Sequence, residues 1–208
     1  LFAGVFGALY SPLVITGLHH MSNAIDTQLV ADFGTTNLWP MIALSNIAQG
    51  SAVLAIIFLH RGDKDEEQVS IPSMISAYLG VTEPAMFGIN LKYVYPFVAA
   101  MIGSGFAAMF STIMGVRANS IGVGGLPGIL AINSTIGGGW LAYSIAMLIA
   151  IVIPFLLTVF FARRGIFNKV EQVMEAEAGQ SPVVLNESLA ASTPSTSKKE
   201  LLFAPASG

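Results

Sequence analysis

The chain has 208 residues, of which 54% are hydrophobic and only 10% are charged. Because an average soluble domain has about 25% charged residues, this composition argues against a soluble globular protein. The formal net charge of −3 provides no basic surface for nucleic acid, and the absence of cysteine excludes disulfides, thiolate metal sites and a cysteine nucleophile.

The charged residues are unevenly distributed along the chain. Six of the eleven charged residues before residue 161 lie in the stretch 61–67, which leaves long uncharged runs elsewhere. A protein embedded in a bilayer requires such runs. The sequence opens within an apolar run, without an initiator methionine and without the basic region of a signal peptide. We therefore expect a membrane protein, and a piece of a longer one.

Four uncharged runs are candidates for membrane-spanning helices, which need about 20 apolar residues. They are residues 1–18, which would be the end of such a helix, and residues 38–59, 93–116 and 140–162. The last is the clearest, because Trp140 lies at one end as an interfacial anchor and Arg163 and Arg164 follow the other. We expect an all-α fold, a polytopic transmembrane helical domain.

Two further stretches are apolar but interrupted. Residues 71–90 contain Glu83 and Pro84, and residues 118–139 contain the run GVGGLPG at 122–128. Irregular backbone at membrane depth is tolerated only where protein buries it or water reaches it. These stretches therefore predict re-entrant hairpins, and such half-spans point to the substrate site of a transporter.

The C-terminal part differs in composition from the rest. Arg163, Arg164 and Lys169 follow the last span and predict a cytoplasmic C-terminal tail. Residues 171–200 are rich in Ser, Thr, Pro and Ala, which predicts a disordered, flexible linker after a membrane domain of residues 1–170. The apolar start of LLFAPASG, at 201–208, predicts the first strand and turn of another domain.

Glu83 is the most informative residue for function. It lies in an apolar segment with no other charge between Gln68 and Leu91, and an ionisable residue within a membrane segment is a functional candidate by default. A carboxylate in a polar cavity accepts strong hydrogen bonds from sugar hydroxyls, or takes the proton of a hydroxyl that attacks phosphorus. The alternative is a structural role, as a cap of a broken helix or a partner of Lys92.

His19 and His20 are the second candidate pair. Adjacent residues of a helix point about 100° apart, so only one of them faces a given cavity. A neutral imidazole donates one hydrogen bond and accepts another; an interfacial histidine pair is an equally good interpretation. Adjacent residues do not easily chelate one ion and no third ligand is evident, so we expect no metal site. The glycine-rich run lacks the Gly-Lys-Ser/Thr ending of a nucleotide loop, and we expect no cofactor.

Asn46 and Gln49 lie three residues apart on one face of the predicted span 38–59. They are candidates for a polar, substrate-binding path. Hydrogen bonding between helices is the alternative, and we favour it because it is common in membrane bundles. Gly103 and Gly105 predict close helix packing.

Four motifs together resemble a known family. They are ITGLHHMSNAID at 15–26, LWPMIALSNIAQGSAVLA at 38–55, ISAYLGVTEPAMFGINLKY at 75–93 and SIGVGGLPGI at 120–129. They look like the membrane IIC domain of the bacterial phosphoenolpyruvate-dependent sugar phosphotransferase system, in the sucrose/trehalose/β-glucoside branch of the glucose superfamily, and are most similar to trehalose permeases. The resemblance covers about residues 1–170, and LLFAPASG is similar to the opening of a IIA domain.

The resemblance implies group translocation in a bacterial cell membrane. An external disaccharide, trehalose first and sucrose or another glucoside second, binds in IIC and is phosphorylated by phospho-IIB. The activity implied is that of a protein-phosphohistidine–sugar phosphotransferase, exerted by the full-length permease, because the residues that carry phosphate lie in IIB and IIA. The glutamate of the TEP motif, here Glu83, and one histidine of the Gly-x-His-His motif, His19 or His20, contact the sugar. The implied partners are the phosphorylated IIB and IIA domains, the lipid bilayer and a second copy in a homodimer.

Two other functions remain possible from the sequence. A proton-coupled secondary sugar transporter would use Glu83 as a proton carrier, but it would not need the predicted linker to a cytosolic domain. A non-transporting membrane anchor would not need Glu83 at membrane depth.

Overall fold

The computed structural model describes residues 1–122, 124–136 and 138–165. Within these residues the chain is helical, without a strand longer than an isolated bridge. The predicted all-α fold is confirmed. The predicted linker, and the predicted start of another domain at 201–208, lie outside the described residues.

Three helices are long and apolar enough to cross a membrane. They are α3 (Leu38–Leu59), α7 (Tyr95–Ile113) and α8 (Gly139–Arg164). Three of the four candidate spans are thereby confirmed. Helix α7 ends at Ile113, three residues before the predicted bound, and starts two residues later than expected, at Tyr95. The reason is Val94, whose φ of 61° interrupts the helical backbone before it. The first apolar run forms a shorter helix, α1 (Phe2–Ile15).

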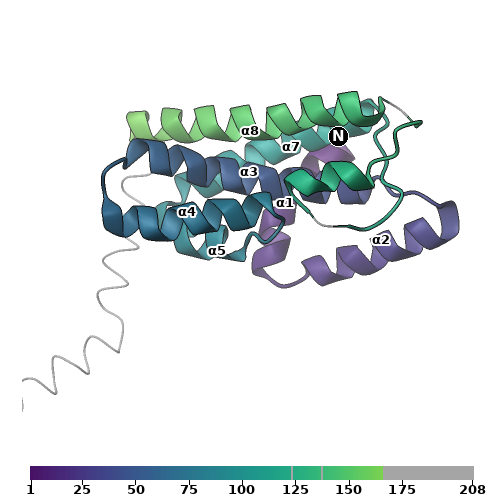
Figure 1. Ribbon diagram of the computed structural model, residues 1–208, viewed down its shortest axis with the longest axis horizontal. Helices are drawn as coiled ribbons and strands as arrows, with labels where there is room; N and C mark the ends of the chain where they lie inside the picture. Colours follow the sequence, from purple (N-terminus) through teal and green to yellow (C-terminus); the bar gives the residue numbers. More distant parts are fainter. Residues whose placement is uncertain (123, 137, 166–208) are drawn as a thin grey trace, which may run out of the picture. The chain divides into compact units, whose positions relative to one another are not determined.

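Burial distinguishes the central helix from the outer one. In the most apolar window of each helix, 78% of α3 is buried but only 22% of α8. Helix α3 therefore lies at the centre, and its neighbours α7 and α8 pack against it (Figure 1). Gly103 permits the close approach of α7 to α8, because a Cβ atom there would lie 2.3 Å from Cγ of Pro154.

The first interrupted stretch is a re-entrant hairpin. It enters through α4 (Lys64–Tyr78) and returns through α5 (Glu83–Ala85), the π-helical turn η1 (Met86–Asn90) and α6 (Leu91–Tyr93). Its two ends lie together, because the Tyr93 hydroxyl donates to Oε1 of Glu66 over 2.5 Å. Nδ1 of His60 lies 2.6 Å from the other oxygen of Glu66.

The second interrupted stretch forms a hairpin from the opposite end. It connects the end of α7 to the start of α8 and contains one 3₁₀ segment, η2 (Leu126–Ala131). The N–H of Asn133 donates to the carbonyl of Arg117, and the N–H of Gly138 donates to the carbonyl of Met114. The chain thus returns to the end it left, which confirms the second re-entrant hairpin.

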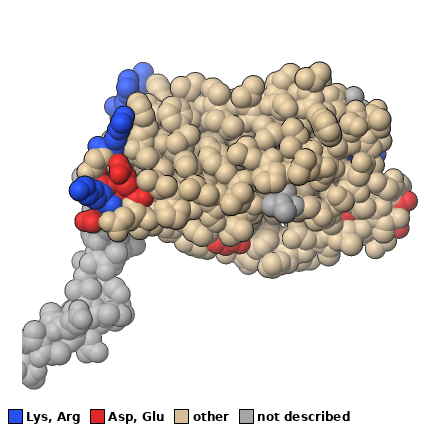
Figure 2. Space-filling view, in the orientation of Figure 1, with Lys and Arg blue, Asp and Glu red and all other residues tan. Residues whose placement is uncertain are grey.

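The surface divides into a charged end and a broad uncharged band. Figure 2 shows the visible lysine and arginine atoms gathered mainly at one end, beside most of the acidic atoms. The loop between α3 and α4, and the end of α8 with Arg163 and Arg164, lie at this end. Large apolar side chains of α8 are exposed along the band, including Leu141, Leu148 and Leu156. A band of exposed apolar side chains is what contact with lipid requires.

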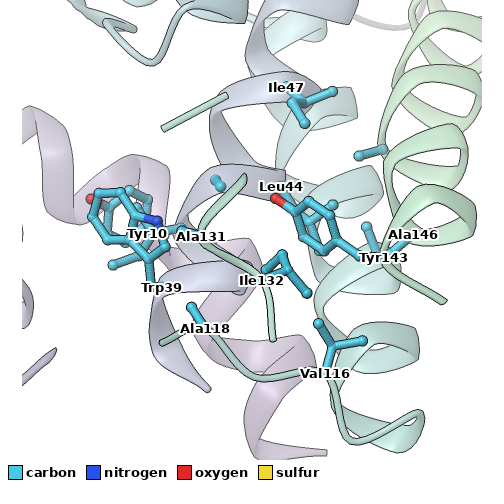
Figure 3. Packing of buried hydrophobic residues seen from close by; sticks show 14 of the residues in the cluster. Tyr10, Trp39, Leu44, Ile47, Val116, Ala118, Ala131, Ile132, Tyr143 and Ala146 are labelled. Carbon is cyan, nitrogen blue, oxygen red and sulfur yellow. The ribbon is translucent and has the colours of Figure 1, made fainter. Parts of the chain in front are cut away.

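The core lies between α1, α3, α7 and α8. Its largest completely buried side chain is Tyr143 of α8, and Leu44 and Ile47 of α3 belong to the same cluster. Figure 3 shows Tyr10 and Trp39 together at another edge of this cluster. Beyond that edge, polar side chains lie next to Tyr10 and Trp39.

Candidate functional site

The tips of the two hairpins meet inside the bundle. Gly80 and Gly125 adopt positive φ angles of 102° and 69°, which glycine adopts without a steric cost. A Cβ atom on Gly125 would lie 2.1 Å from the carbonyl oxygen of Tyr78, so only glycine fits. Nδ2 of Asn46 donates to the carbonyl oxygen of Gly80 over 3.2 Å, which fixes the first tip against α3.

A cavity of about 160 Å³ lies beside this junction. Its walls come from α1, α3, the two hairpin tips and α2 (His19–Phe33), the helix that connects α1 to the segment before α3. The side chains that give it hydrogen-bonding character are Tyr10, His19, Asn23, Trp39, Asn46 and Glu83. A concave site where interrupted helices meet is the expected place for a ligand.

Three residues of the cavity wall each have a buried polar atom without a hydrogen-bond partner among the described residues. The atoms are Nδ1 of His19, Oδ1 of Asn23 and Nε1 of Trp39. A buried polar group without a partner costs about 1–3 kcal/mol, so most are paired with protein, water or a ligand. The indole donates, the amide oxygen accepts and the imidazole does either. This combination matches a ligand with several hydroxyl groups, because each hydroxyl both donates and accepts.

The structure brings three of the five predicted site residues to the cavity. Glu83, His19 and Asn46 line it. His20 is not part of the wall; it is exposed, and its ring lies beside that of His19 with 4.0 Å between the ring centroids. The two histidines therefore differ in environment, as adjacent helical residues should.

Gln49 lies away from the cavity, between three helical segments. Its Nε2 donates to Oγ of Ser11 over 2.7 Å, and its Oε1 accepts from Nδ2 of Asn90 over 2.5 Å. Its side chain is 1% exposed. This arrangement is the hydrogen bonding between helices that the sequence favoured for Gln49, whereas Asn46 both lines the cavity and fixes the hairpin tip.

Replacement of Gln49 by leucine should therefore destabilise the protein more than it weakens ligand binding. The change removes one hydrogen bond each from Ser11 and Asn90, which keep only the Ser45 hydroxyl and the backbone carbonyl of residue 49. We expect a loss of about 1–2 kcal/mol in the free energy of unfolding. Thermal unfolding of the purified protein in detergent measures this loss. A Gln49→Leu variant with parental stability and lost ligand affinity would contradict the structural role.

Four residues with polar side chains line the cavity but were not predicted from the sequence: Tyr10, Asn23, Trp39 and Thr82. Asn23 could have been found, because it lies four residues after His19 and so on the same helix face. Tyr10 and Trp39 carry no such signal, since aromatic residues in apolar helices usually belong to the core. Their role depends on the approach of α1 and α3 to the hairpin tips.

Asp26 is a buried carboxylate next to the cavity wall. Its side chain is 0% exposed, and it accepts a hydrogen bond from the hydroxyl of Thr36. Its other carboxylate oxygen, Oδ2, is buried without a hydrogen-bond partner among the described residues. Burial raises the pKa of Asp26 above its ordinary value, and the hydrogen bond from Thr36 opposes this rise. In the described part of the chain, no group of three or more His, Asp or Glu side chains is suited to hold a metal ion.

Comparison with known proteins identifies the family. The sequence profile described as "Phosphotransferase system, EIIC" matches residues 1–104, half of the chain. The chain belongs to this family. The EIIC part of these systems is the membrane domain, in agreement with the three apolar helices. No solved structure matches the chain.

Curated relatives carry names from the same system. The chain is 56% identical over 162 residues to the trehalose-specific EIIBC component of Escherichia coli, a match that covers 78% of the chain and 33% of the relative. It is 51% identical over 160 residues to the trehalose-specific EIIBC component of Bacillus subtilis, covering 76% and 33%. It is 36% identical over 202 residues to the sucrose-specific EIIBCA component of Pediococcus pentosaceus, covering 96% and 30%. The chain spans about a third of the length of these relatives.

Proposed function

We propose that the chain binds a glucosyl disaccharide in the cavity between the hairpin tips and presents it for phosphorylation during uptake. The observation that carries this proposal is that His19, Asn23 and Trp39, which line one cavity, each have a buried polar atom without a partner among the described residues. Trehalose is the first candidate, because relatives above 50% identity are named trehalose-specific. Sucrose is the second, because relatives at 46% identity and below are named sucrose-specific.

The size of the cavity limits how a disaccharide is held. At about 160 Å³, it is smaller than the roughly 300–1,000 Å³ of ordinary ligand pockets. One hexose ring therefore occupies the cavity, and the second ring extends beyond it. The ring inside is the one that meets Glu83, His19 and Trp39.

Glu83 has two roles in this proposal. As a carboxylate, it accepts charge-assisted hydrogen bonds from the hydroxyls of the bound ring. It also accepts the proton of the hydroxyl that attacks phosphorus. The sugar oxygen forms the new O–P bond, the bond between phosphorus and its carrier residue in phospho-IIB breaks, and that residue leaves with the bonding electron pair. His19 donates to, or accepts from, a second hydroxyl as a neutral imidazole.

The proposed partners follow from the names of the relatives and from the sequence of residues 201–208. The EIIBC and EIIBCA names support a phosphorylated IIB domain as phosphoryl donor and a IIA domain before it. The match to the EIIBCA relative covers 96% of this chain and therefore includes most of the residues after the last helix. The interpretation of residues 201–208 as the beginning of a IIA domain rests on the resemblance of LLFAPASG to the opening of such a domain. We include a homodimer in the proposal as well.

Sugar-specific phosphorylation by the full-length permease tests the function. Membranes that contain it, supplied with phosphoenolpyruvate and the general phosphotransferase proteins, should phosphorylate trehalose and should not phosphorylate mannitol. Uptake of unmodified trehalose driven by a proton gradient would instead support a secondary transporter. Membranes that neither bind nor phosphorylate trehalose or sucrose would overturn the proposal.

The charged end of the bundle should face the cytoplasm. This end carries the loop 61–67 together with Arg163 and Arg164, and cytoplasmic ends are enriched in Lys and Arg. We expect a cysteine introduced at exposed Lys64 to react with a membrane-impermeant maleimide in inside-out vesicles and to be protected in intact cells. A cysteine at exposed Asp32, before the start of α3, should show the opposite pattern. The reverse result for both positions would invert the topology.

A further inference from the structure

Helix α2 contributes two residues, His19 and Asn23, to the cavity wall, but it has few buried side chains of its own. Of its fifteen residues, only Ser22 and Asp26 are buried. His19, Asn23 and Asp26 share one helix face, because they lie four and three residues apart. The first two line the cavity, so their positions depend on how this face is attached to the rest of the bundle.

Asp26 makes that attachment at the start of α3. Helix α3 has no side-chain cap from its own N-cap residue, Asn37. The Thr36 hydroxyl accepts from the N–H of Leu38 over 3.1 Å and donates to Oδ1 of Asp26. A hydroxyl that accepts from an N–H group of the first turn stabilises a helix start. Here the hydroxyl is held by a carboxylate of a different helix, so the cap also joins α2 to α3.

The same connection reaches the second hairpin. The backbone of Thr36 pairs with Ala118 in both directions, with N–O distances of 2.9 and 2.8 Å. The Asp26–Thr36 pair therefore lies where α2, the first turn of α3 and the base of the second hairpin meet. The three elements all contribute walls to the cavity.

We propose that Asp26 is a positioning residue for sugar binding, because it fixes His19 and Asn23 of α2 opposite the first turn of α3. This inference rests on the proposed function. Asp26 does not line the cavity and does not contact the sugar. It acts through the hydrogen-bond acceptor that it presents to the Thr36 hydroxyl, so an isosteric acceptor should replace it.

Equilibrium binding of radiolabelled trehalose to the full-length permease in membranes tests the inference. Asp26→Ala should bind about tenfold more weakly than the parent, because the cap and the attachment of α2 are lost together. Asp26→Asn keeps an acceptor oxygen, and asparagine caps helices about as well as aspartate, so its affinity should remain within about threefold of the parent. The trehalose affinity of Thr36→Val should lie between those of the two Asp26 variants. The double variant with Asp26→Ala and Thr36→Val should bind no more weakly than Asp26→Ala alone.

A matched control separates positioning from general stability. Thr158 of α8 has a buried hydroxyl, 0% exposed, and is not part of the cavity wall. Thr158→Val should therefore bind with parental affinity. If Asp26→Ala does not accumulate in membranes, the trehalose affinities of Thr36→Val and Thr158→Val are compared instead. Weaker binding by Thr36→Val alone supports the inference. Equal affinity of the two variants overturns it.

The possible results distinguish this inference from the proposed function. If the parent and the folded Asp26→Ala variant bind trehalose equally well, the positioning role alone is overturned. The role is also overturned if the folded Asp26→Asn variant binds trehalose as weakly as the folded Asp26→Ala variant, because the hydrogen-bond acceptor would then not explain the effect. A parent that binds neither trehalose nor sucrose overturns the proposed function, and the positioning role with it.

Discussion

Replacement of Glu83 by glutamine in the full-length permease should reduce sugar binding and phosphorylation roughly ten- to a hundredfold. The lost interaction is a hydrogen bond to a charged acceptor, worth about 1.5–3 kcal/mol. Glutamine also cannot accept the proton of the attacking hydroxyl, so kcat should fall together with affinity. Membrane insertion should be unaffected, because removing a carboxylate from an apolar segment removes a cost.

The control for this prediction is a carboxylate elsewhere in the same protein. Asp32 of α2 is exposed and pairs with Gln28, with no part in the cavity wall. Asp32→Asn makes the same chemical change as Glu83→Gln and should leave KM and kcat at parental values. Normal uptake and phosphorylation by the Glu83→Gln variant would show that Glu83 is not in the site.

The two histidines should prove unequal, with His19 the important one. His19→Ala leaves the sugar hydroxyls without their partner, at a cost of about 1–3 kcal/mol, or roughly 5- to 150-fold in affinity. His19→Gln keeps a donor and an acceptor and should be milder. His20→Ala should bind within about threefold of the parent, since His20 is exposed outside the wall.

Sugar affinity of the four single variants, alanine and glutamine at each position, measures this difference. The pair is its own control, because both residues lie in the same turn of α2. Parental affinity in all four variants would remove both histidines from the site. A larger loss at His20 than at His19 would mean that α2 is rotated during binding relative to the structure described here.

The spans and hairpins could be predicted because they depend on local composition. Helix α3 has the predicted bounds, 38–59, since an uncharged run of this length has few alternatives in a bilayer. The glycines, proline and glutamate within 71–90 mark that stretch as irregular for the same reason. Glu83 and the histidine pair also stood out locally, as polar residues in apolar surroundings.

Contacts between distant segments could not be predicted in this way. The partners of Gln49 lie 38 and 41 residues away along the chain, and only the packing of α1, α3 and the first hairpin brings them together. The distinction between His19 and His20 depends on the turn between α1 and α2. The carboxylate that holds the Thr36 cap of α3 comes from another helix, so no spacing rule for helix caps would find it.

The meeting of the two hairpin tips also has a consequence for the permeability of the bilayer. Because neither hairpin is a complete span, we expect the barrier to ions here to depend on the contact between the two glycine turns. A methyl group on Gly125 would push against the Tyr78 carbonyl and part these turns. The expected defect of such a variant is an electrical one: a permease that conducts protons or small cations even when no sugar is present.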